Sequence, residues 1–272
     1  MILRELVDGS SLLIHNKNIQ YKNYFTICSS HKVIAKPPWE KVQFLKYETF
    51  LNFNKIITKQ KEYAFNRDIT FKVFHTYTNT GAYVNFINYK NQNVPLRAIG
   101  DGFAPWAILN KAILELHASS VYIDDTLVII LGFHNSGKTT AALNLVKYCN
   151  GTQISDDALD ILITDEKVKA RASFWEEGCK HISIESNKII IIILDDNSIK
   201  YNDGTKRNLN EGMLIAQYVI GLFCNIKIFN LGINLIESLI STASIKIIPA
   251  LPNANYLTDQ INKILKRKGN SC

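Results

Sequence analysis

The chain has 272 residues, of which 47% are hydrophobic, and a formal net charge of +7. Apolar side chains are numerous enough to fill a core, which favours a folded protein over an intrinsically disordered one. The positive charge is mild for this length and is spread along the chain, and the absence of interleaved aromatic and basic residues argues against a nucleic-acid-binding strip. One basic run at residues 263–268 is interpreted as the solvated end of a helix, with a nucleic-acid contact as the alternative.

The cysteines and the termini bear on the compartment. Five cysteines stand far apart, without a C-x-x-C pair or a Cys/His cluster, which favours reduced thiols over a disulfide framework or a zinc site. Glu5 and Asp8 fall where a signal peptide needs an apolar core, so we expect a cytoplasmic protein. The apolar stretch Met213–Ile240 is interrupted by polar side chains too often for a membrane span, and we expect no membrane partner.

The first hundred residues have the alternating pattern of short antiparallel strands. Residues 69–73 and 82–86 alternate on either side of a turn at Asn79–Gly81 and predict a β-hairpin. Further short strands are expected at residues 24–28 and 31–35. No chemistry-bearing motif falls in this region.

From residue 105 onward the pattern changes to mixed helices and buried strands. Pro105 is expected to open a helix over Trp106–Leu116, because proline is tolerated in a first helical turn. A strand at residues 119–123 follows. The isoleucine-rich run at residues 189–194 predicts a strand that is buried on both faces, and a helix over residues 211–223 is expected to pack beside it.

Between these elements lies Gly132-Phe-His-Asn-Ser-Gly-Lys-Thr139, which fits the phosphate-binding pattern G-x-x-x-x-G-K-[ST] at every fixed position. A strand pattern from Thr126 precedes it and a helix pattern follows it. The glycines let successive amides point at a phosphate, and the helix adds the positive end of its dipole. The alternative is a chance glycine-rich turn between core elements. The predicted nucleotide-binding residues are Gly132, Asn135, Ser136, Gly137, Lys138, Thr139 and Thr140.

The next acidic motif is Ser155-Asp156-Asp157. Transfer of a phosphoryl group to a hydroxyl needs an anion cradle, a divalent ion and a base that takes the hydroxyl proton. If the segment is extended, Asp156 and Asp157 point to opposite sides and can divide the last two tasks. A turn or a helix cap is the alternative interpretation of the pair. His134, in a variable position of the loop, is interpreted as a solvated surface residue, with a phosphate contact as the alternative.

An earlier segment, Leu116-His117-Ala118-Ser119-Ser120-Val121, completes a series of three motifs. The order L-H-A-S-x-V, G-x-x-x-x-G-K-T, S-D-D resembles the HPr kinase/phosphorylase-like family over about residues 100 to 225. Those proteins share a P-loop fold related to phosphoenolpyruvate carboxykinase and phosphorylate a serine hydroxyl. The resemblance implies an α/β fold with this kinase core at residues 101–272 and a smaller β-rich region at residues 1–100.

The resemblance also implies roles for single residues. Asp156 would be the catalytic base and His117 its partner, with Lys138 contacting the β- and γ-phosphates. Thr139 and Asp157 would lie at Mg²⁺. Exchange of the roles of Asp156 and Asp157 stays open, and a structural histidine at a helix end is the alternative for His117.

Two further segments of the family pattern are altered here. Lys206-Arg207-Asn208-Leu209 is similar to the family's G-R-N-L, which implies that Arg207 handles the transferred phosphate, a solvated loop arginine being the alternative. The family's segment with a catalytic glutamate, L-x-E-I-x-G, has no clean counterpart. The candidates are Glu176 or Glu177, with Glu185 as a rival. These departures favour a shorter relative that does not act on HPr, and a reverse phosphorylase activity stays open.

Together these observations predict an ATP- and Mg²⁺-dependent kinase that phosphorylates a serine-type hydroxyl of a peptide, a protein or a small metabolite. GTP is an alternative to ATP. A nucleotide-binding module that recruits a peptide and transfers little or no phosphate is the alternative function. Residues 1–100 would recognise the acceptor. We expect no nucleic-acid partner, and a homo-oligomer stays open because the family often forms one.

Overall fold

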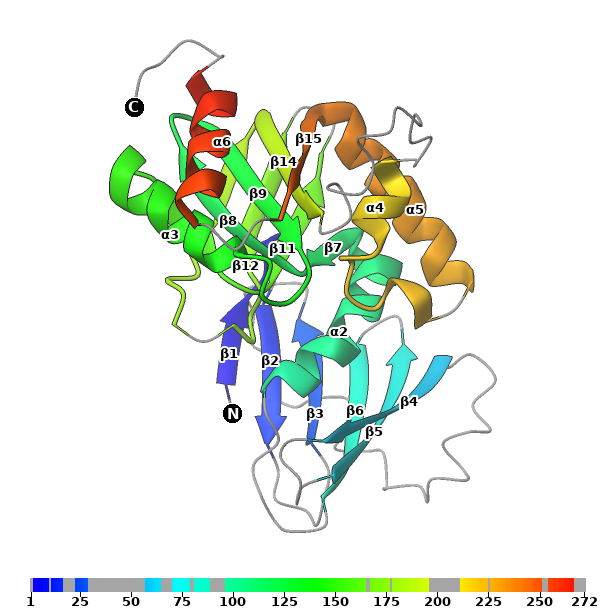
Figure 1. The fold of residues 1–272 in the computed structure, drawn as a ribbon. Helices are drawn as coiled ribbons and strands as arrows, with labels where there is room; N and C mark the ends of the chain where they lie inside the picture. Colours follow the sequence, from blue (N-terminus) through cyan, green and yellow to red (C-terminus); the bar gives the residue numbers. More distant parts are fainter. Residues whose placement is uncertain are drawn as a thin grey trace.

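The structure is a computed structural model with a mixed α/β fold (Figure 1). It describes residues 2–9, 11–16, 23–28, 57–64, 70–78, 81–88, 96–164, 167–176, 178–195, 211–224, 226–250 and 254–266. Statements below refer to these residues.

A five-stranded sheet in the order β10-β8-β9-β14-β15 lies at the centre of the part that carries the motifs. Strands β9, β14 and β15 run parallel, whereas β8 is antiparallel to β9 and β10 is antiparallel to β8. Their bounds are β8 Ala118–Ile123, β9 Thr126–Gly132, β10 Thr152–Ser155, β14 Lys188–Asp195 and β15 Ala243–Pro249. The strands predicted before the motif and in the isoleucine run are confirmed.

Strands β9 and β14 are apolar between their ends because both faces of this sheet are covered. Along β9, Leu127, Ile129 and Leu131 enter one buried cluster, while Val128 and Ile130 enter another on the opposite face. Alternate side chains of a strand point to opposite faces, so a strand covered on both sides has no polar position. The same alternation continues in β14.

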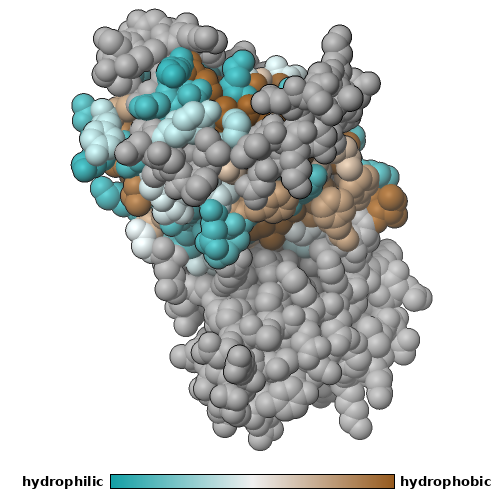
Figure 2. All heavy atoms as spheres, viewed as in Figure 1, coloured by the Kyte–Doolittle hydropathy of each residue, from teal (hydrophilic) through white to brown (hydrophobic). Residues whose placement is uncertain are grey.

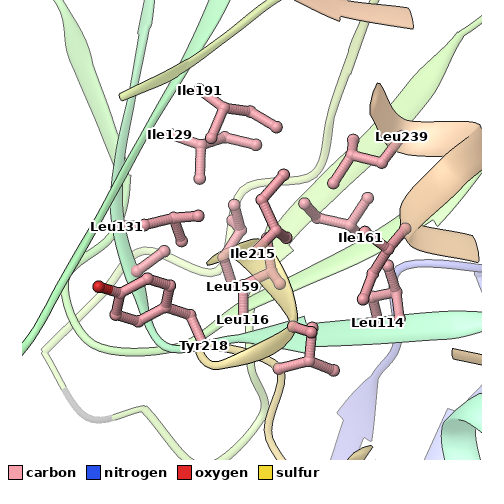
Figure 3. Packing of buried hydrophobic residues seen from close by; sticks show 14 of the residues in the cluster. Leu114, Leu116, Ile129, Leu131, Leu159, Ile161, Ile191, Ile215, Tyr218 and Leu239 are labelled. Atoms are coloured by element: carbon pink, nitrogen blue, oxygen red, sulfur yellow. The ribbon is translucent and has the colours of Figure 1, made fainter. Parts of the chain in front are cut away.

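A second sheet covers one face of the first. Its order is β13-β12-β11-β7, and all of its pairs are antiparallel. The bounds are β7 Ile113–Leu116, β11 Leu159–Ile163, β12 Val168–Ala172 and β13 Ile184–Ser186. Figure 3 shows Leu116 and Leu159 from this sheet in the same cluster as Ile129 and Leu131 from the central sheet. The main core therefore lies between the two sheets.

Helices complete both sides of the central sheet (Figure 1). Helices α3 (Lys138–Cys149) and α6 (Ala254–Lys266) contribute Leu145 and Ile261 to the cluster on one face. On the other side lie α2 (Leu96–Lys111), α4 (Glu211–Ala216), the 3₁₀ turn η3 (Leu222–Cys224) and α5 (Ile226–Thr242). Within the described residues, no helix is both long enough and apolar enough to cross a membrane.

The N-terminal part consists of two three-stranded antiparallel sheets, β1-β2-β3 and β4-β5-β6, and β3 lies beside β6 (Figure 1). The bounds are β1 Ile2–Glu5, β2 Ser11–Asn16, β3 Asn23–Cys28, β4 Ile57–Ala64, β5 Thr70–Thr78 and β6 Gly81–Asn88. The predicted hairpin is the pair β5–β6, and the strand expected at residues 24–28 is β3. The strand expected at residues 31–35 lies outside the described residues, and the domain boundary at residue 100 stays a prediction.

The first predicted helix is wrong at both ends. Helix α2 begins at Leu96, so Pro105 lies inside it, and it ends at Lys111. Ala112 then adopts a positive φ of 54°, which breaks the helix. The four residues that follow form β7 with every side chain buried. Because a short apolar run that is buried on all sides has no readable period, the strand was mistaken for the end of the helix.

The helix predicted over residues 211–223 is interrupted. Helix α4 ends at Ala216, and a turn leads through Gly221, which has a φ of 76°, into η3. A Cβ atom on Gly221 would lie 2.6 Å from ring atoms of Pro105. A close approach between two elements therefore requires the glycine that ends the helical pattern.

Some of the exposed apolar side chains lie near η3 and the start of α5. Figure 2 shows hydrophobic residues over the region where η3 and the start of α5 lie. Phe223 and Ile226 are exposed there, and the ring of Phe223 lies 5.8 Å from that of Phe229. This surface is formed by elements that cover the second sheet, not by the motif loop.

Candidate functional site

The chain crosses from one sheet to the other at two places that lie side by side. His117 joins β7 in the second sheet to β8 in the central sheet. Residues 156–158 join β10 in the central sheet to β11 in the second. Because β10 pairs with β8 and β11 pairs with β7, the two crossings must meet. The amide of Ala118 donates a hydrogen bond to the carbonyl of Asp157, 3.2 Å away.

Strand register brings the motif loop to the same point. Ala118 pairs with Leu131 in the antiparallel β8–β9 ladder, so His117 lies level with Gly132, the first residue of the motif. Strand β9 ends there, and α3 begins at Lys138. The strand and the helix predicted on either side of the motif are both present. The sheet topology therefore brings the three sequence motifs to one end of the central sheet.

The motif loop (residues 132–139) is a tight turn with two left-handed residues. Asn135 has a φ of 64° and Gly137 a φ of 93°. The amide of Ser136 donates to the carbonyl of Phe133 at 3.2 Å. A Cβ atom on Gly132 would lie 2.3 Å from Oγ of Ser136, so only glycine fits at this position without a shift of its neighbours.

Lys138 is buried at the centre of the loop. Its Nζ donates hydrogen bonds to the carbonyls of Gly132 at 2.8 Å and Phe133 at 3.0 Å. Burial lowers the pKa of Lys138, and the charges of Asp157 and Asp156 oppose that shift. A cation whose closest partners are neutral carbonyls is well placed to neutralise an anion that enters the loop.

His117 connects the lysine to one carboxylate. Nζ of Lys138 lies 3.3 Å from Nε2 of His117, and Nδ1 of His117 lies 3.0 Å from Oδ1 of Asp157. An ammonium can only donate, so Nε2 accepts and the proton of the neutral ring is assigned to Nδ1, which donates to Asp157. His117 is thus paired with Asp157, whereas the family resemblance implied a partnership with Asp156.

The two carboxylates differ in how far they are already engaged. Asp156 and Asp157 lie in a bend, not in the extended segment that was considered for them. The side chain of Asp157 is paired with His117. Oδ1 of Asp156 lies 3.5 Å from Oγ of Ser119, whose stronger hydrogen bond, at 2.5 Å, goes to the carbonyl of Asp156. Asp156 therefore carries the less engaged carboxylate of the two.

All of these groups line one cavity of about 790 Å³. Its lining residues are His117, His134, Asn135, Ser136, Gly137, Lys138, Thr139, Thr140, Asp156 and Asp157. Every predicted nucleotide-binding residue except Gly132 is in this set, and Gly132 begins the loop. No group of three His, Cys, Asp or Glu side chains within the described ranges is assembled to hold a metal ion by itself.

Glu176, one of three glutamate candidates, lies next to the carboxylate pair but contacts the backbone there. Its carboxylate accepts hydrogen bonds from the amides of Asp156, Asp157 and Ala158. Burial raises the pKa of Glu176, and the hydrogen bonds that it accepts oppose the rise. Glu185 is exposed on β13, where it forms an ion pair with Lys169 at 2.8 Å. Glu177 and Arg207 lie outside the described residues.

Some contributors were not anticipated. Ser119 holds the carbonyl of Asp156, and Cys179 donates a hydrogen bond to Oε1 of Glu176 at 2.9 Å. Oγ of Ser120 lies 2.8 Å from that of Ser155 and joins β8 to β10 just before the bend. Ser119 and Ser155 belong to the quoted motifs, so the motifs themselves carried a signal for them. No sequence pattern pointed to Cys179, because its hydrogen bond to Glu176 depends on the folded structure.

Comparison with known proteins adds little. No family model matches the chain, and no curated protein matches it. Among solved structures, the HPr(Ser) kinase/phosphatase from Coxiella burnetii is similar to it with a TM-score of 0.32 and 18% sequence identity, over 57% of this chain and 93% of that one. A TM-score this low carries no argument about fold or function. The family resemblance of the motifs therefore stays a prediction.

Proposed function

We propose that this protein is an ATP- and Mg²⁺-dependent kinase that transfers the γ-phosphoryl group to a serine-type hydroxyl of a peptide, a protein or a small metabolite. One observation carries the proposal. A single cavity brings together a glycine-rich loop at the start of a helix, the buried ammonium of Lys138, and the carboxylates of Asp156 and Asp157. Phosphoryl transfer is catalysed by positioning and by charge neutralisation, and these are the groups it needs.

The loop and the start of α3 would bind the phosphates of the donor nucleotide. Amides at the start of a helix attract anions, and Lys138 would exchange its two backbone carbonyl partners for phosphate oxygens. Thr139 is exposed at the first turn of α3. Its hydroxyl and the carboxylate of Asp157 are the hard oxygen ligands that Mg²⁺ prefers, and substrate phosphates commonly complete such a site. The ion would supply further neutralisation of phosphate charge.

Asp156 is proposed as the base. Its carboxylate takes the proton of the acceptor hydroxyl while the acceptor oxygen forms a bond to the γ-phosphorus. The bond from that phosphorus to the β–γ bridging oxygen breaks, and the nucleoside diphosphate leaves. The weaker engagement of Asp156 supports this assignment, since Asp157 is already paired with His117. His117 would orient Asp157 and keep Lys138 near the transferred group.

The acceptor is best sought by mass. Candidate peptides and free serine are incubated with Mg²⁺ and ATP or GTP, and intact mass is measured for each. We expect one acceptor to gain one phosphate, and Asp156→Asn to lower the rate by about 10²- to 10⁴-fold while nucleotide still binds. Lys138→Ala should weaken nucleotide binding instead.

Two exposed residues provide matched controls. Asp124→Asn changes a carboxylate in the turn between β8 and β9, and Lys147→Ala changes a lysine in the last turn of α3. Both should keep wild-type activity. If the wild type binds nucleotide but phosphorylates no acceptor, and Asp156→Asn changes nothing, the proposal fails and a nucleotide-binding module that recruits a peptide replaces it.

A further inference from the structure

We infer that Glu176 is a positioning residue that holds the bend at residues 156–158 in the shape that the reaction requires. The inference rests on the proposed kinase function. It gives Glu176 a role through the backbone, in contrast to the direct catalytic role for which this glutamate was a candidate.

The strand ladders leave a gap at the bend. On one side the β10–β8 ladder ends with Ser155 opposite Ser120, and on the other the β11–β7 ladder begins with Leu159 opposite Leu116. The residues between, 156 to 158, have no ladder partner for their amides. An amide that is shielded from water and lacks an acceptor is destabilising, so the buried amide of Ala158 and the half-buried amides of Asp156 and Asp157 need another acceptor.

Glu176 supplies that acceptor for all three amides. Oε1 accepts from the amides of Asp156 and Asp157, the latter at 3.1 Å, and Oε2 accepts from the amide of Ala158 at 3.0 Å. Only a carboxylate offers two acceptor oxygens at the end of a side chain of this length. Glutamine would keep one oxygen and turn an NH₂ group toward one of the donors.

The glutamate is itself held rigidly. Ser173, Phe174 and Trp175, which precede it, are all buried. The amide of Ser173 donates to the carbonyl of Ala158 at 2.9 Å, so the segment is also attached to the far end of the bend. The ring of Phe174 lies 5.2 Å from that of Phe103 in α2. The amide of Glu176 donates to the carbonyl of Ser173 at 3.0 Å, which closes the turn.

Cys179 fixes the carboxylate from a third direction. Its thiol donates to Oε1 of Glu176 at 2.9 Å, and burial together with this carboxylate raises the pKa of the thiol to about 12. The thiol therefore stays protonated, and remains a donor, at neutral pH. With the backbone amides it makes four donors around one carboxylate.

This anchor bears on the chemistry because the bend carries both site carboxylates. Residues 156 and 157 point into the cavity, and Asp157 must stay within 3.0 Å of His117. A rotation of the freed backbone would move both carboxylates at once. A displacement of about 1 Å at a reacting group can cost about 100-fold in rate.

The test compares Glu176→Gln with Glu185→Gln, an exposed glutamate of the same neighbourhood in sequence. Hydrogen exchange of backbone amides is measured by mass spectrometry, and steady-state kinetics are measured with ATP and the acceptor. For Glu176→Gln we expect faster exchange, by about tenfold or more, in the peptide that contains residues 156–158, with unchanged exchange in α3. The kcat should fall by about 10- to 100-fold, while the Kd for nucleotide measured without Mg²⁺, to which Asp157 does not contribute, stays unchanged. Glu185→Gln should change neither.

A loss of stability alone must be separated from a loss of positioning. Val168→Ala opens the core at the end of β12 that pairs with Ile163, far along the ladder from the bend. At a temperature well below both midpoints, Val168→Ala should keep its kcat even where its Tm falls as far as that of Glu176→Gln. Cys179→Ser, which retains a donor, should exchange more slowly at the bend than Cys179→Ala.

Three results would overturn the inference: unchanged exchange at residues 156–158 in Glu176→Gln, faster exchange with wild-type kcat, or an equal loss of kcat in Val168→Ala. If the wild type transfers no phosphate at all, the kinase proposal fails. The exchange measurement then still decides whether Glu176 holds the bend, and unchanged exchange still overturns that claim.

Discussion

The motif loop and the bend face each other across one cavity, but they keep their shapes by different means. The hydrogen bonds that shape the loop lie mainly within its own eight residues: Asn135 and Gly137 are left-handed, and Lys138 donates to two carbonyls of the loop. The bend relies on Glu176, which lies 18 to 20 residues away in sequence. The conformation of a local turn is determined by its own residues. The amides that lie between two sheets, in contrast, need an acceptor from a segment that is distant in sequence.

The difference implies that the two halves of the site can be damaged separately. Changes in the loop should affect nucleotide binding first, because the loop would hold the phosphates. Changes around the bend should affect the transfer rate first, because the bend carries the proposed base. Variants on each side that keep the fold can test this division.

The largest effect is expected for Gly132→Ala in the loop. The added Cβ would lie 2.3 Å from Oγ of Ser136 and 3.0 Å from Cβ of Leu194, so the loop must shift from a buried strand end. We expect nucleotide affinity to fall by about 100-fold, measured by calorimetry. Gly178→Ala is the control: alanine is strained there by the positive φ of 87°, but its Cβ meets no atom within 4 Å and lies outside the motif loop, so nucleotide affinity should stay unchanged. Two results for Gly132→Ala would contradict this division of the site: unchanged nucleotide affinity, or faster amide exchange at residues 156–158 with unchanged exchange in the motif loop.

A smaller effect is expected for Ser119→Ala beside the bend. This change removes the hydrogen bond of 2.5 Å to the carbonyl of Asp156 but leaves Glu176 and its three amides in place. One such hydrogen bond contributes about 1 kcal/mol, which corresponds to a fall in kcat of about fivefold, with nucleotide affinity unchanged. Ser238→Ala, which removes a hydroxyl exposed on α5, should behave as wild type. A change in nucleotide affinity without a change in kcat would assign Ser119 to the loop instead.

The same contrast explains how much could be predicted from the sequence. The strand before the motif loop and the helix after it were predicted correctly, because glycine positions and apolar runs report on local conformation, whereas phosphate binding by the loop stays a prediction. The cavity residues His117, Asp156 and Asp157 were named because they stand in short motifs, and the fold brings them together with Lys138. Their detailed pairing was not predictable, since the meeting of His117 with Asp157 follows from strand register between two sheets.

The errors have a related cause. Residues 113–116 were assigned to a helix, although they form β7, because all four side chains are buried and the run has no periodicity. Without β7 the second sheet could not be predicted, and without that sheet there was no crossing at His117 and no gap at residues 156–158. The role of Glu176 could not be predicted either, because that role depends on the gap at residues 156–158.

Asp160 lies just beyond the bend and tests how far the influence of Glu176 extends. It faces away from the core cluster, opposite Glu115 of β7 and Arg171 of β12 in the ladders. Burial raises the pKa of Asp160 to about 8, with the charges of Glu176 and Asp8 adding to the rise and that of Arg171 opposing it. The folded protein therefore keeps this proton up to about pH 8, while the unfolded chain loses it near its ordinary value of 3.8.

The least effect on the chemistry, but a distinct effect on stability, is expected for Asp160→Asn. Between these two pKa values the folded state binds one more proton than the unfolded state, so the contribution of Asp160 to the free energy of unfolding falls as pH rises. Asparagine removes that dependence. In urea unfolding, the free energy of unfolding of Asp160→Asn should therefore rise relative to that of the wild type by roughly 1 kcal/mol between pH 6 and pH 7, with kcat little changed. Thr152→Ala, an exposed change on β10 without a titrating group, should keep a constant difference. Because the charge of Glu176 helps to raise the pKa of Asp160, this relative increase in the free energy of unfolding should be smaller in a Glu176→Gln background. A gain that is independent of pH would mean that Asp160 is already ionised in the folded protein.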